Sequence, residues 1–393
     1  MPLPVPNARS RTIEESLTLA ISARAARMKA AGQDVVSLGA GEPDFPVPTP
    51  VAEAGVDAIR SGRTRYTPAA GVAELRAAGA RWLADTFGIP YTADEVMATA
   101  GAKAALHMAL STIVEKGDVV LVLAPFWVSY PALVRMADGV PVVLDAVPDS
   151  GFLHAPEAVL AAARKHGAKG IILNFPNNPS GVVPSAAQVQ AYVDVARQAD
   201  LWILSDEIYG QLTYDGTRHV SPAAVPGGKE RTIVVNGFTK SHTLTGWRIS
   251  FLAGPKPVID ACTRIQSQVL GNACTISQEA AIAACRIPLA EELQARLRAF
   301  DERRRFLVDA VNAIPRLRAS MPRGAFYVML DVRNLLGGDD VAFAERLLDK
   351  HLLAGVPGSA FGAPGFLRLS YAASMQDLQK AVERLRACVE GIR

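Results

Sequence analysis

The sequence predicts an α/β fold, with a mostly parallel sheet in a large domain and a smaller α+β domain. Two observations carry this prediction. The 393 residues are 50% apolar and 20% charged, a composition that can bury a core large enough for two domains. Short aliphatic runs also alternate with longer alanine-rich segments of helical period, a pattern typical of parallel sheets covered by helices.

The predicted strands of the large domain are short aliphatic and β-branched runs. They cover residues 96–100, 119–123, 140–144, 170–173, 201–204 and 232–235. Helices are predicted over residues 102–115 and 188–198, where apolar residues recur with helical period. The C-terminal part begins with a long charged helix and continues with two strands and two helices, at residues 293–314, 324–330, 366–369, 342–351 and 375–392.

Two stretches predict where the chain divides. The proline-rich residues 43–50 are typical of a connector, and a second boundary is expected at residues 286–292, before the long charged helix. We therefore expect an N-terminal segment that joins the small domain, a large domain that binds the ligand, and a small C-terminal domain. Their predicted ranges are residues 1–48, 49–288 and 289–393.

Composition and charge exclude several classes of protein. The formal net charge is only +3 and basic residues are interspersed with acidic ones, so we expect neither nucleic acid nor a membrane surface as partner. No apolar run approaches the length of a membrane span. The cysteines lack the spacing of a disulfide framework or a zinc site, which predicts a reducing cytoplasmic compartment and no metal; they are Cys262, Cys274, Cys285 and Cys388.

A glycine-containing corner between a predicted strand and a predicted helix is a candidate anion site. It is the stretch Thr99-Ala100-Gly101-Ala102-Lys103, where free backbone N–H groups and the helix dipole favour negative charge. The alternative is that Gly101 only permits a tight turn. Arg248 favours the anion site, because a guanidinium group holds a phosphate through two parallel hydrogen bonds.

Polar side chains follow two predicted parallel strands, at the edge where open α/β sheets bind ligands. Residues 174–181, Asn-Phe-Pro-Asn-Asn-Pro-Ser-Gly, follow one strand, and Asp206-Glu207-Ile208-Tyr209 follow the next. The asparagines offer oriented amides to a ligand, although an ordinary Asn-Pro turn is the simpler explanation of that stretch taken alone. A buried carboxylate at Asp206 is costly unless a cationic partner faces it.

Lys240 stands among small polar residues, where a solvated loop charge is its simplest interpretation in isolation. Further motifs follow in order along the chain and change that interpretation. Together they resemble the class I aminotransferases of fold type I, which use pyridoxal phosphate, and are most similar to the bacterial aspartate aminotransferase subgroup. The resemblance covers about residues 38–371 and rests on Ala40-Gly41-Glu42-Pro43-Asp44-Phe45, Arg65-Tyr66-Thr67-Pro68, Asn178-Pro179-Ser180-Gly181, Ser205-Asp206-Glu207-Ile208-Tyr209, Lys240 to Arg248, and Leu367-Arg368-Leu369-Ser370.

The resemblance implies a seven-stranded sheet in the large domain and pyridoxal 5′-phosphate as cofactor. It assigns Lys240 as the residue that forms a Schiff base with the cofactor and later carries the Cα proton of the substrate. Asp206 would face the pyridine nitrogen and keep it protonated, which makes the ring an electron sink. Asn178 and Tyr209 would hydrogen-bond the phenolic oxygen of the ring and so lower the pKa of the imine, and Trp127 would stack on the ring.

The remaining contacts are also implied by the resemblance. The phosphate would lie on the N–H groups around Gly101, Ala102 and Lys103, with Arg248 completing the site. In this family Tyr66 reaches the phosphate of the neighbouring subunit, which implies a homodimer with composite active sites.

Substrate recognition follows from the same resemblance. Arg368 would bind the α-carboxylate through a two-pronged contact, with Gly41, Trp127 and Asn178 nearby. Lys103 matches the lysine that approaches the distal carboxylate of aspartate or glutamate in this subgroup.

Three positions depart from the pattern of the subgroup or match none of its roles. Residues 266–274, which we expect to line the side-chain pocket, lack the usual Asn-Pro pattern. Glu14 occupies the region where prephenate-using relatives carry a lysine, so prephenate activity is disfavoured. His242 matches no family role, and we expect it to be a structural or solvated loop residue.

The sequence therefore predicts an amino acid:2-oxo acid aminotransferase that works by ping-pong transamination. Aspartate or glutamate is the expected donor, with 2-oxoglutarate or pyruvate as acceptor. Alternatives within the same chemistry are an aromatic, alanine or arginine:pyruvate aminotransferase and a carbon–sulfur β-lyase. The alternative from another class is a non-catalytic regulator on this fold; such regulators usually add a DNA-binding domain, for which we expect no space before Leu38.

Overall fold

The computed structural model describes residues 5–11, 13 and 17–392. Its largest element is a seven-stranded sheet with the strand order β2-β8-β7-β6-β5-β3-β4. The bounds of these strands are β2 (Val96–Thr99), β3 (Val119–Leu123), β4 (Val140–Leu144), β5 (Gly170–Asn174), β6 (Trp202–Asp206), β7 (Thr232–Asn236) and β8 (Ser250–Ala253). The seven-stranded sheet expected from the sequence is confirmed.

The strands from β3 to β7 pair in parallel with one another. β8 runs antiparallel to both of its neighbours, β2 and β7. It was not predicted from the sequence, because its residues Ser250-Phe251-Leu252-Ala253 include no β-branched side chain. Asn174 and Asp206 pair in the register of β5 and β6, so two polar side chains lie next to each other at the carboxyl end of the sheet.

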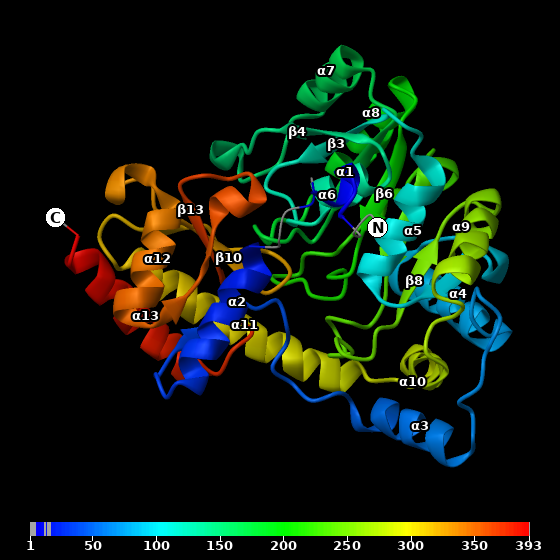
Figure 1. Ribbon diagram of the computed structural model, residues 1–393, viewed down its shortest axis with the longest axis horizontal. Coiled ribbons are helices and arrows are strands. Elements are labelled where there is room, and N and C mark those ends of the chain that lie inside the picture. Colours follow the sequence, from blue (N-terminus) through cyan, green and yellow to red (C-terminus); the bar gives the residue numbers. More distant parts are fainter. Residues whose placement is uncertain (1–4, 12, 14–16, 393) are drawn as a thin grey trace.

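Helices cover both faces of this sheet (Figure 1). Their bounds are α3 (Thr49–Arg60), α4 (Ala73–Phe87), α5 (Ala102–Ile113), α6 (Tyr130–Met136), α7 (Pro156–His166), α8 (Ala186–Gln198), α9 (Lys256–Val269) and α10 (Thr275–Arg286). Alternate strand residues point to opposite faces: Val122 and Leu204 pack with α5, α6 and α9, while Leu121 and Ile203 pack with α7 and α8. Helices α4 and α10 share a core with β2 and β8.

Helix α8 begins two residues before its predicted start. Ser185 explains the difference, because its Oγ accepts a hydrogen bond from the backbone of Gln188 while the Gln188 side chain accepts one from the Ser185 backbone. This reciprocal capping satisfies two N–H groups at the helix start. The helix therefore begins at the cap and not at the first apolar residue.

The C-terminal part forms a four-stranded sheet with the order β12-β13-β10-β9. It comprises α11 (Ala290–Asn312), β9 (Arg318–Ala319), β10 (Tyr327–Asp331), α12 (Asp340–His351), β12 (Val356–Pro357), β13 (Phe366–Ser370) and α13 (Met375–Glu390). The strand predicted at residues 324–330 begins only at Tyr327. Ala325 has a φ of 56°, a left-handed conformation that a strand does not contain.

The N-terminal segment packs against this C-terminal part. It contains α1 (Ala8–Arg11), α2 (Leu17–Ala30) and β1 (Val36–Ser37), and β1 pairs in parallel with β11 (Leu353–Ala354). Figure 1 shows α2 beside the part of the molecule that holds α12 and α13. We propose that the chain divides at the predicted boundaries, residues 1–48, 49–288 and 289–393; the β1–β11 pairing and the separate sheets support this division.

In the part of the chain that the structure describes, no helix is both long enough and apolar enough to span a membrane.

Candidate active site

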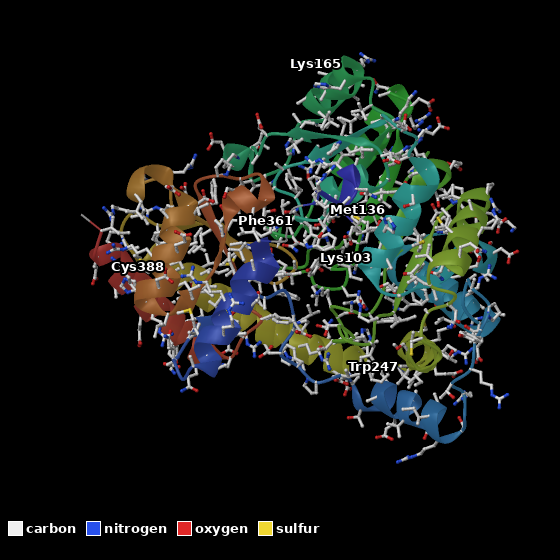
Figure 2. All side chains as sticks on the ribbon, in the orientation of Figure 1. Lys103, Met136, Lys165, Trp247, Phe361 and Cys388 are labelled. Atoms are coloured by element: carbon white, nitrogen blue, oxygen red, sulfur yellow. The ribbon has the colours of Figure 1, made fainter. Side chains whose placement is uncertain are left out.

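A cavity of about 220 Å³ lies at the carboxyl ends of β5 and β6 and also meets β10 and β13. Figure 2 shows Lys103 and Phe361 near the centre of the view, where the two parts of the molecule meet. Among the described residues, the cavity is lined by ten that the sequence predicted, which are Gly41, Ala102, Lys103, Trp127, Asn178, Asp206, Tyr209, Lys240, Arg248 and Arg368. It is also lined by Thr18, Tyr130, Asn174, Ile208, Thr239 and Tyr327.

Lys240 lies in the loop after β7, and its side chain lines the cavity. Its Nζ donates a hydrogen bond to the carbonyl oxygen of Gly41 over 2.6 Å. Burial lowers the pKa of the Lys240 amine to about 8, although the negative charges of Glu42 and Asp206 oppose this shift. A large fraction of the amine is therefore neutral near pH 8, which is the form that attacks a carbonyl carbon.

Asp206 is the last residue of β6, and its side chain is buried. Its Oδ2 accepts a hydrogen bond from the hydroxyl of Tyr130 over 2.8 Å, and its Oδ1 accepts one from the backbone of Ile208 over 3.3 Å. Burial raises the pKa of Asp206 to about 6, while the hydrogen bond from Tyr130 opposes the rise. A cation placed against this carboxylate would compensate its buried charge.

Arg368 lies in the middle of β13 and is 1% exposed. Its Nη1 donates to Oδ1 of Asn178 over 2.9 Å and its Nη2 to the carbonyl oxygen of Gly39 over 2.5 Å. No described atom accepts a hydrogen bond from its Nε. Burial lowers the pKa of Arg368, but a guanidinium group stays charged in proteins. A buried guanidinium without a carboxylate beside it is suited to bind one.

The predicted anion corner lies at the N-terminus of α5. Gly101 has a φ of 87°, and a Cβ atom there would collide with the guanidinium group of Arg248. Arg248, which is exposed in this chain, donates to the carbonyl oxygens of Thr245 over 3.0 Å and Ala100 over 3.4 Å. Burial and the nearby Arg248 charge lower the pKa of Lys103. The corner therefore gathers positive charge that a phosphate would neutralise.

The family model described as aminotransferase class I and II matches residues 33–385. The chain belongs to this family.

Individual relatives agree over nearly the whole chain. A bifunctional aspartate aminotransferase and glutamate/aspartate-prephenate aminotransferase of Petunia hybrida is 41% identical over 98% of this chain and 83% of its own length. An aspartate aminotransferase of Geobacillus stearothermophilus is 40% identical over 97% of this chain and 98% of its own length. A solved structure of aspartate aminotransferase from Thermus thermophilus with maleate has a TM-score of 0.94 at 39% identity, covering 98% of this chain and 100% of that one.

These findings confirm the resemblance predicted from the sequence. The protein is a pyridoxal-phosphate-dependent aminotransferase of fold type I, of the bacterial aspartate aminotransferase type. As an aminotransferase it acts on amino acids and 2-oxo acids.

The residues of this aminotransferase fit its cofactor in three places. Asp206 is a buried anion that suits a protonated pyridine nitrogen, and the corner at Gly101 and Arg248 suits a phosphate group. Lys240 offers an amine of lowered pKa to an aldehyde. Asp206, Arg248 and Lys240 all line the same cavity.

Aromatic rings form another part of the cavity wall. Trp127 meets Tyr130 edge to face, with ring centroids 5.4 Å apart, and Nζ of Lys103 lies 5.0 Å from the centre of the Trp127 ring. The hydroxyl of Tyr209 lies 2.8 Å from that of Tyr327. These rings line the same cavity as Lys240 and Arg368, where an amino acid substrate would need to bind.

Two predicted site residues do not line this cavity. Gly101 precedes the lining residue Ala102 and lies against the guanidinium group of Arg248, which does line the cavity. Tyr66 is 96% exposed.

Three further expectations concern the surroundings of the site. The expectation that residues 266–274 line the pocket is wrong for the cavity of their own chain, because α9 carries the first of them into the outer helical layer and Leu270 is 44% exposed. His242 is a buried loop residue whose Nδ1 lies 2.8 Å from Oγ of Ser241; burial, then Arg296, lowers its pKa to about 3. It is structural and not solvated. Glu14 lies outside the described residues.

Five polar lining residues were not predicted, and Thr239, which directly precedes Lys240, is one of them. Asn174 stands in the segment 174–181 that the sequence singled out, where the end of a buried strand was a usable signal, and Tyr130 lies three residues after the predicted Trp127. Tyr327 stands inside a predicted strand, where an aromatic residue is ordinary. Thr18 lies on α2 with its Oγ1 buried and without a partner among the described atoms, and no local pattern marks it.

Proposed function

We propose that this enzyme transfers the amino group of aspartate or glutamate to a 2-oxo acid, 2-oxoglutarate or pyruvate, by ping-pong transamination. One observation carries the choice of a dicarboxylic substrate: Arg368 and Lys103 line the same cavity as separate cationic groups. Arg368 is fully buried and ready for an α-carboxylate. Lys103 then remains for a second carboxylate on the substrate side chain.

The bound cofactor supplies an aldehyde that joins covalently to amines and a ring that withdraws electrons from the substrate Cα. Asp206 would hold the proton on the ring nitrogen, and Asn178 and Tyr209 would hydrogen-bond the phenolic oxygen. The backbone at Gly101, Ala102 and Lys103, with Arg248, would bind the phosphate, and Trp127 would stack on the ring.

The remaining groups act on the substrate. Arg368 binds the α-carboxylate, and the backbone of Gly41 limits the space beside it. Lys240, whose Nζ is neutral in part near pH 8, accepts the proton from the substrate Cα and returns it later in the reaction. The names of relatives in petunia, Geobacillus and Thermus support aspartate and glutamate as substrates.

A donor panel tests the substrate class. Lys103→Met should reduce kcat/KM for aspartate and glutamate by roughly ten- to a hundredfold, the effect of losing a charge-assisted contact worth about 1.5–3 kcal/mol. The value for alanine should change little, because alanine has no distal carboxylate. The matched control is Lys116→Met, at an exposed lysine beyond the same helix. A wild-type enzyme that prefers a neutral donor would refute the proposal.

Prephenate belongs in the same panel. The petunia relative and a Thermus aquaticus relative carry prephenate in their names, whereas Glu14 in this sequence disfavours it. We propose that prephenate is a poor substrate here. Turnover of prephenate at the rate of 2-oxoglutarate would contradict the argument from Glu14.

We also propose that the working unit is a homodimer with composite sites, in a reducing cytoplasm. Tyr66 and Arg248 support the dimer, since both are exposed in one chain although each is assigned to the phosphate site. The free state of all four cysteines supports the compartment. Mixing Tyr66→Ala subunits with Lys240→Ala subunits should restore activity at limiting cofactor, because one site of each hybrid is then intact. Hybrids with no more activity than either parent would refute the composite site.

A further inference from the structure

Tyr327 forms a hydrogen bond across the two parts of the enzyme, inside the active-site cavity. It belongs to β10 of the small sheet, whereas Tyr209 follows β6 of the large sheet. Their hydroxyl oxygens lie 2.8 Å apart, and the two residues are 1% and 4% exposed. Because both hydroxyls are buried, each has few possible hydrogen-bond partners. The direction of this bond therefore decides whether Tyr209 still has a proton to donate to a ligand in the cavity.

The same phenol supports the substrate-binding arginine. The guanidinium carbon of Arg368 lies 4.4 Å from the centre of the Tyr327 ring, a cation–π contact. A Cβ atom on Gly41 would collide with the Tyr327 hydroxyl, so the backbone whose carbonyl receives Nζ of Lys240 lies directly against it. Tyr327 thus contacts Tyr209, which is assigned to the cofactor, and Arg368, which is assigned to the substrate. It also lies against Gly41, whose carbonyl oxygen accepts the hydrogen bond from Lys240.

A phenol has only one proton to donate. If Tyr209 donated to Tyr327, its proton could not reach a cofactor oxygen. If Tyr327 donates instead, the Tyr209 oxygen accepts that bond and its own proton stays available, and a chain of two hydrogen bonds strengthens each by roughly 10–30%.

We propose that Tyr327 is a positioning residue that donates its proton to Tyr209, so that Tyr209 in turn donates to the phenolic oxygen of pyridoxal phosphate. This inference rests on the proposed role of Tyr209. The ring of Tyr327 has a second, separate role, which is to hold Arg368 in position for the α-carboxylate.

The charges around the pair are consistent with this direction. Burial raises the pKa of both phenols, so both keep their protons. The charged groups that face them are Asp206 from β6, Arg368 from β13 and Lys240 from the loop after β7, while Glu42 faces Lys240. Among the described residues, neither phenol donates a hydrogen bond to a charged group, which leaves the Tyr209 proton for a bound ligand.

The test is a pH titration of the visible absorption of the holoenzyme, whose midpoint reports the proton on the Lys240 nitrogen. Hydrogen bonds to the phenolic oxygen draw negative charge away from that proton and lower the midpoint. Tyr209→Phe should therefore raise the midpoint. Tyr327→Phe should raise it by roughly a tenth to a third as much, and the double variant should match Tyr209→Phe alone.

A matched control and a second variant separate this role from a general structural one. Tyr371→Phe removes another fully buried hydroxyl, which donates to Ala325 over 3.1 Å outside the cavity, and should leave the midpoint unchanged. Tyr327→Leu lacks both hydroxyl and ring, so it should shift the midpoint as Tyr327→Phe does and also raise KM for the amino acid. Tyr327→Phe should leave that KM near the wild-type value.

The possible results separate the role proposed for Tyr327 from the role proposed for Tyr209. A wild-type midpoint in both Tyr327 variants, or a shift from Tyr327→Phe that persists in the Tyr209→Phe background, would overturn the positioning role and leave the proposed function standing. An unchanged midpoint in Tyr209→Phe would overturn the role proposed for Tyr209 as well. Substrate specificity, measured with the donor panel, is independent of both results.

Discussion

The hydroxyl of Tyr130 and the carboxylate of Asp206 are joined by a 2.8 Å hydrogen bond at the base of the active-site cavity. Tyr130 is the first residue of α6, while Asp206 ends β6 in the middle of the large sheet. The bond supports the negative form of a carboxyl group whose burial favours the neutral form. A helix on one face of the sheet thereby helps to keep Asp206, the proposed counter-ion of the cofactor, charged.

Removing that bond should weaken cofactor binding. Tyr130→Phe should raise the pKa of Asp206 above about 6, and a hydrogen bond to a charged group contributes about 1.5–3 kcal/mol, so affinity should fall by roughly ten- to a hundredfold. As the pH is lowered, a carboxyl group of raised pKa becomes neutral earlier. Cofactor affinity should therefore begin to fall at a higher pH in the variant than in the wild type. Cofactor titrations at several pH values measure this.

The control for Tyr130 is Tyr192→Phe, which removes a buried hydroxyl that donates to the carbonyl oxygen of His154 over 2.8 Å, away from the cavity. It should lose stability without losing cofactor affinity. Equal affinities in the Tyr130 variant and the wild type at all pH values would show that the hydrogen bond does not support Asp206.

The apoenzyme should show one unusually reactive lysine. The pKa of about 8 for Lys240, against 10.5 for an ordinary lysine, makes its neutral form roughly 300-fold more abundant at neutral pH, a factor of ten for each pH unit. The rate of borohydride-trapped labelling by an aldehyde should rise with pH and level off above about 8. Peptide mapping identifies the labelled residue.

Two variants check this pH dependence. Lys240→Ala should carry no label in the mapped peptide. Asp206→Asn should lower the midpoint further, because the negative charge of Asp206 raises the pKa of Lys240. A midpoint near that of free lysine would mean that the amine is less buried than the structure has it.

A methyl group at position 101 should damage phosphate binding selectively. Gly101→Ala places a Cβ atom against the guanidinium group of Arg248 and also strains a backbone with a φ of 87°. Gly117→Ala strains a similar backbone, with a φ of 90°, but its Cβ atom meets nothing within 4 Å. Both should lose about 1–2 kcal/mol of stability. Only Gly101→Ala should lose affinity for pyridoxal phosphate, and it should bind unphosphorylated pyridoxal as the wild type does.

Calorimetry of the apoenzymes gives the stabilities, and absorption titrations give the affinities. Parallel losses of cofactor affinity in both glycine variants would mean that backbone strain, and not the position of Arg248, is responsible.

Arg368 should matter for the substrate and not for the cofactor. Arg368→Lys keeps a positive charge but loses the planar fork. Losing one of the two hydrogen bonds to the substrate carboxylate costs about 1.5–3 kcal/mol, which corresponds to a loss of roughly ten- to a hundredfold in kcat/KM for every amino donor. The visible spectrum of the bound cofactor should be retained. Steady-state kinetics and absorption spectra measure the two effects, and a variant that no longer binds cofactor would show that Arg368 has a different role.

Much of the fold was readable from local patterns. The buried strands β3, β5, β6 and β7 are aliphatic runs, and the helices α12 and α13 begin within two residues of their predicted starts. β8 was not predicted because its residues, Ser-Phe-Leu-Ala, include no β-branched side chain. β10 starts later than predicted because Ala325 has a left-handed backbone, and no local sequence pattern predicts this conformation.

Part of the site could be predicted from the sequence. Motifs that follow buried parallel strands place Asp206 and Asn178 at the same edge of the sheet, and this placement does not depend on how the side chains pack. The order of those motifs also pointed to Lys240 and Arg368, and both line the cavity. Tertiary structure alone decided which other residues reach the cavity. Tyr327 and Thr18 come from segments more than 300 residues apart in the chain, and only the packing of the small sheet and α2 around the large sheet brings both to the same place.

The ionisation of the site likewise depends on the folded molecule. A lysine and an aspartate have ordinary pKa values in an extended chain. Burial under several distant segments shifts them toward each other, to about 8 and about 6, because desolvation disfavours both charged forms. The sequence therefore determined which groups react, and the tertiary structure determined how readily they do so.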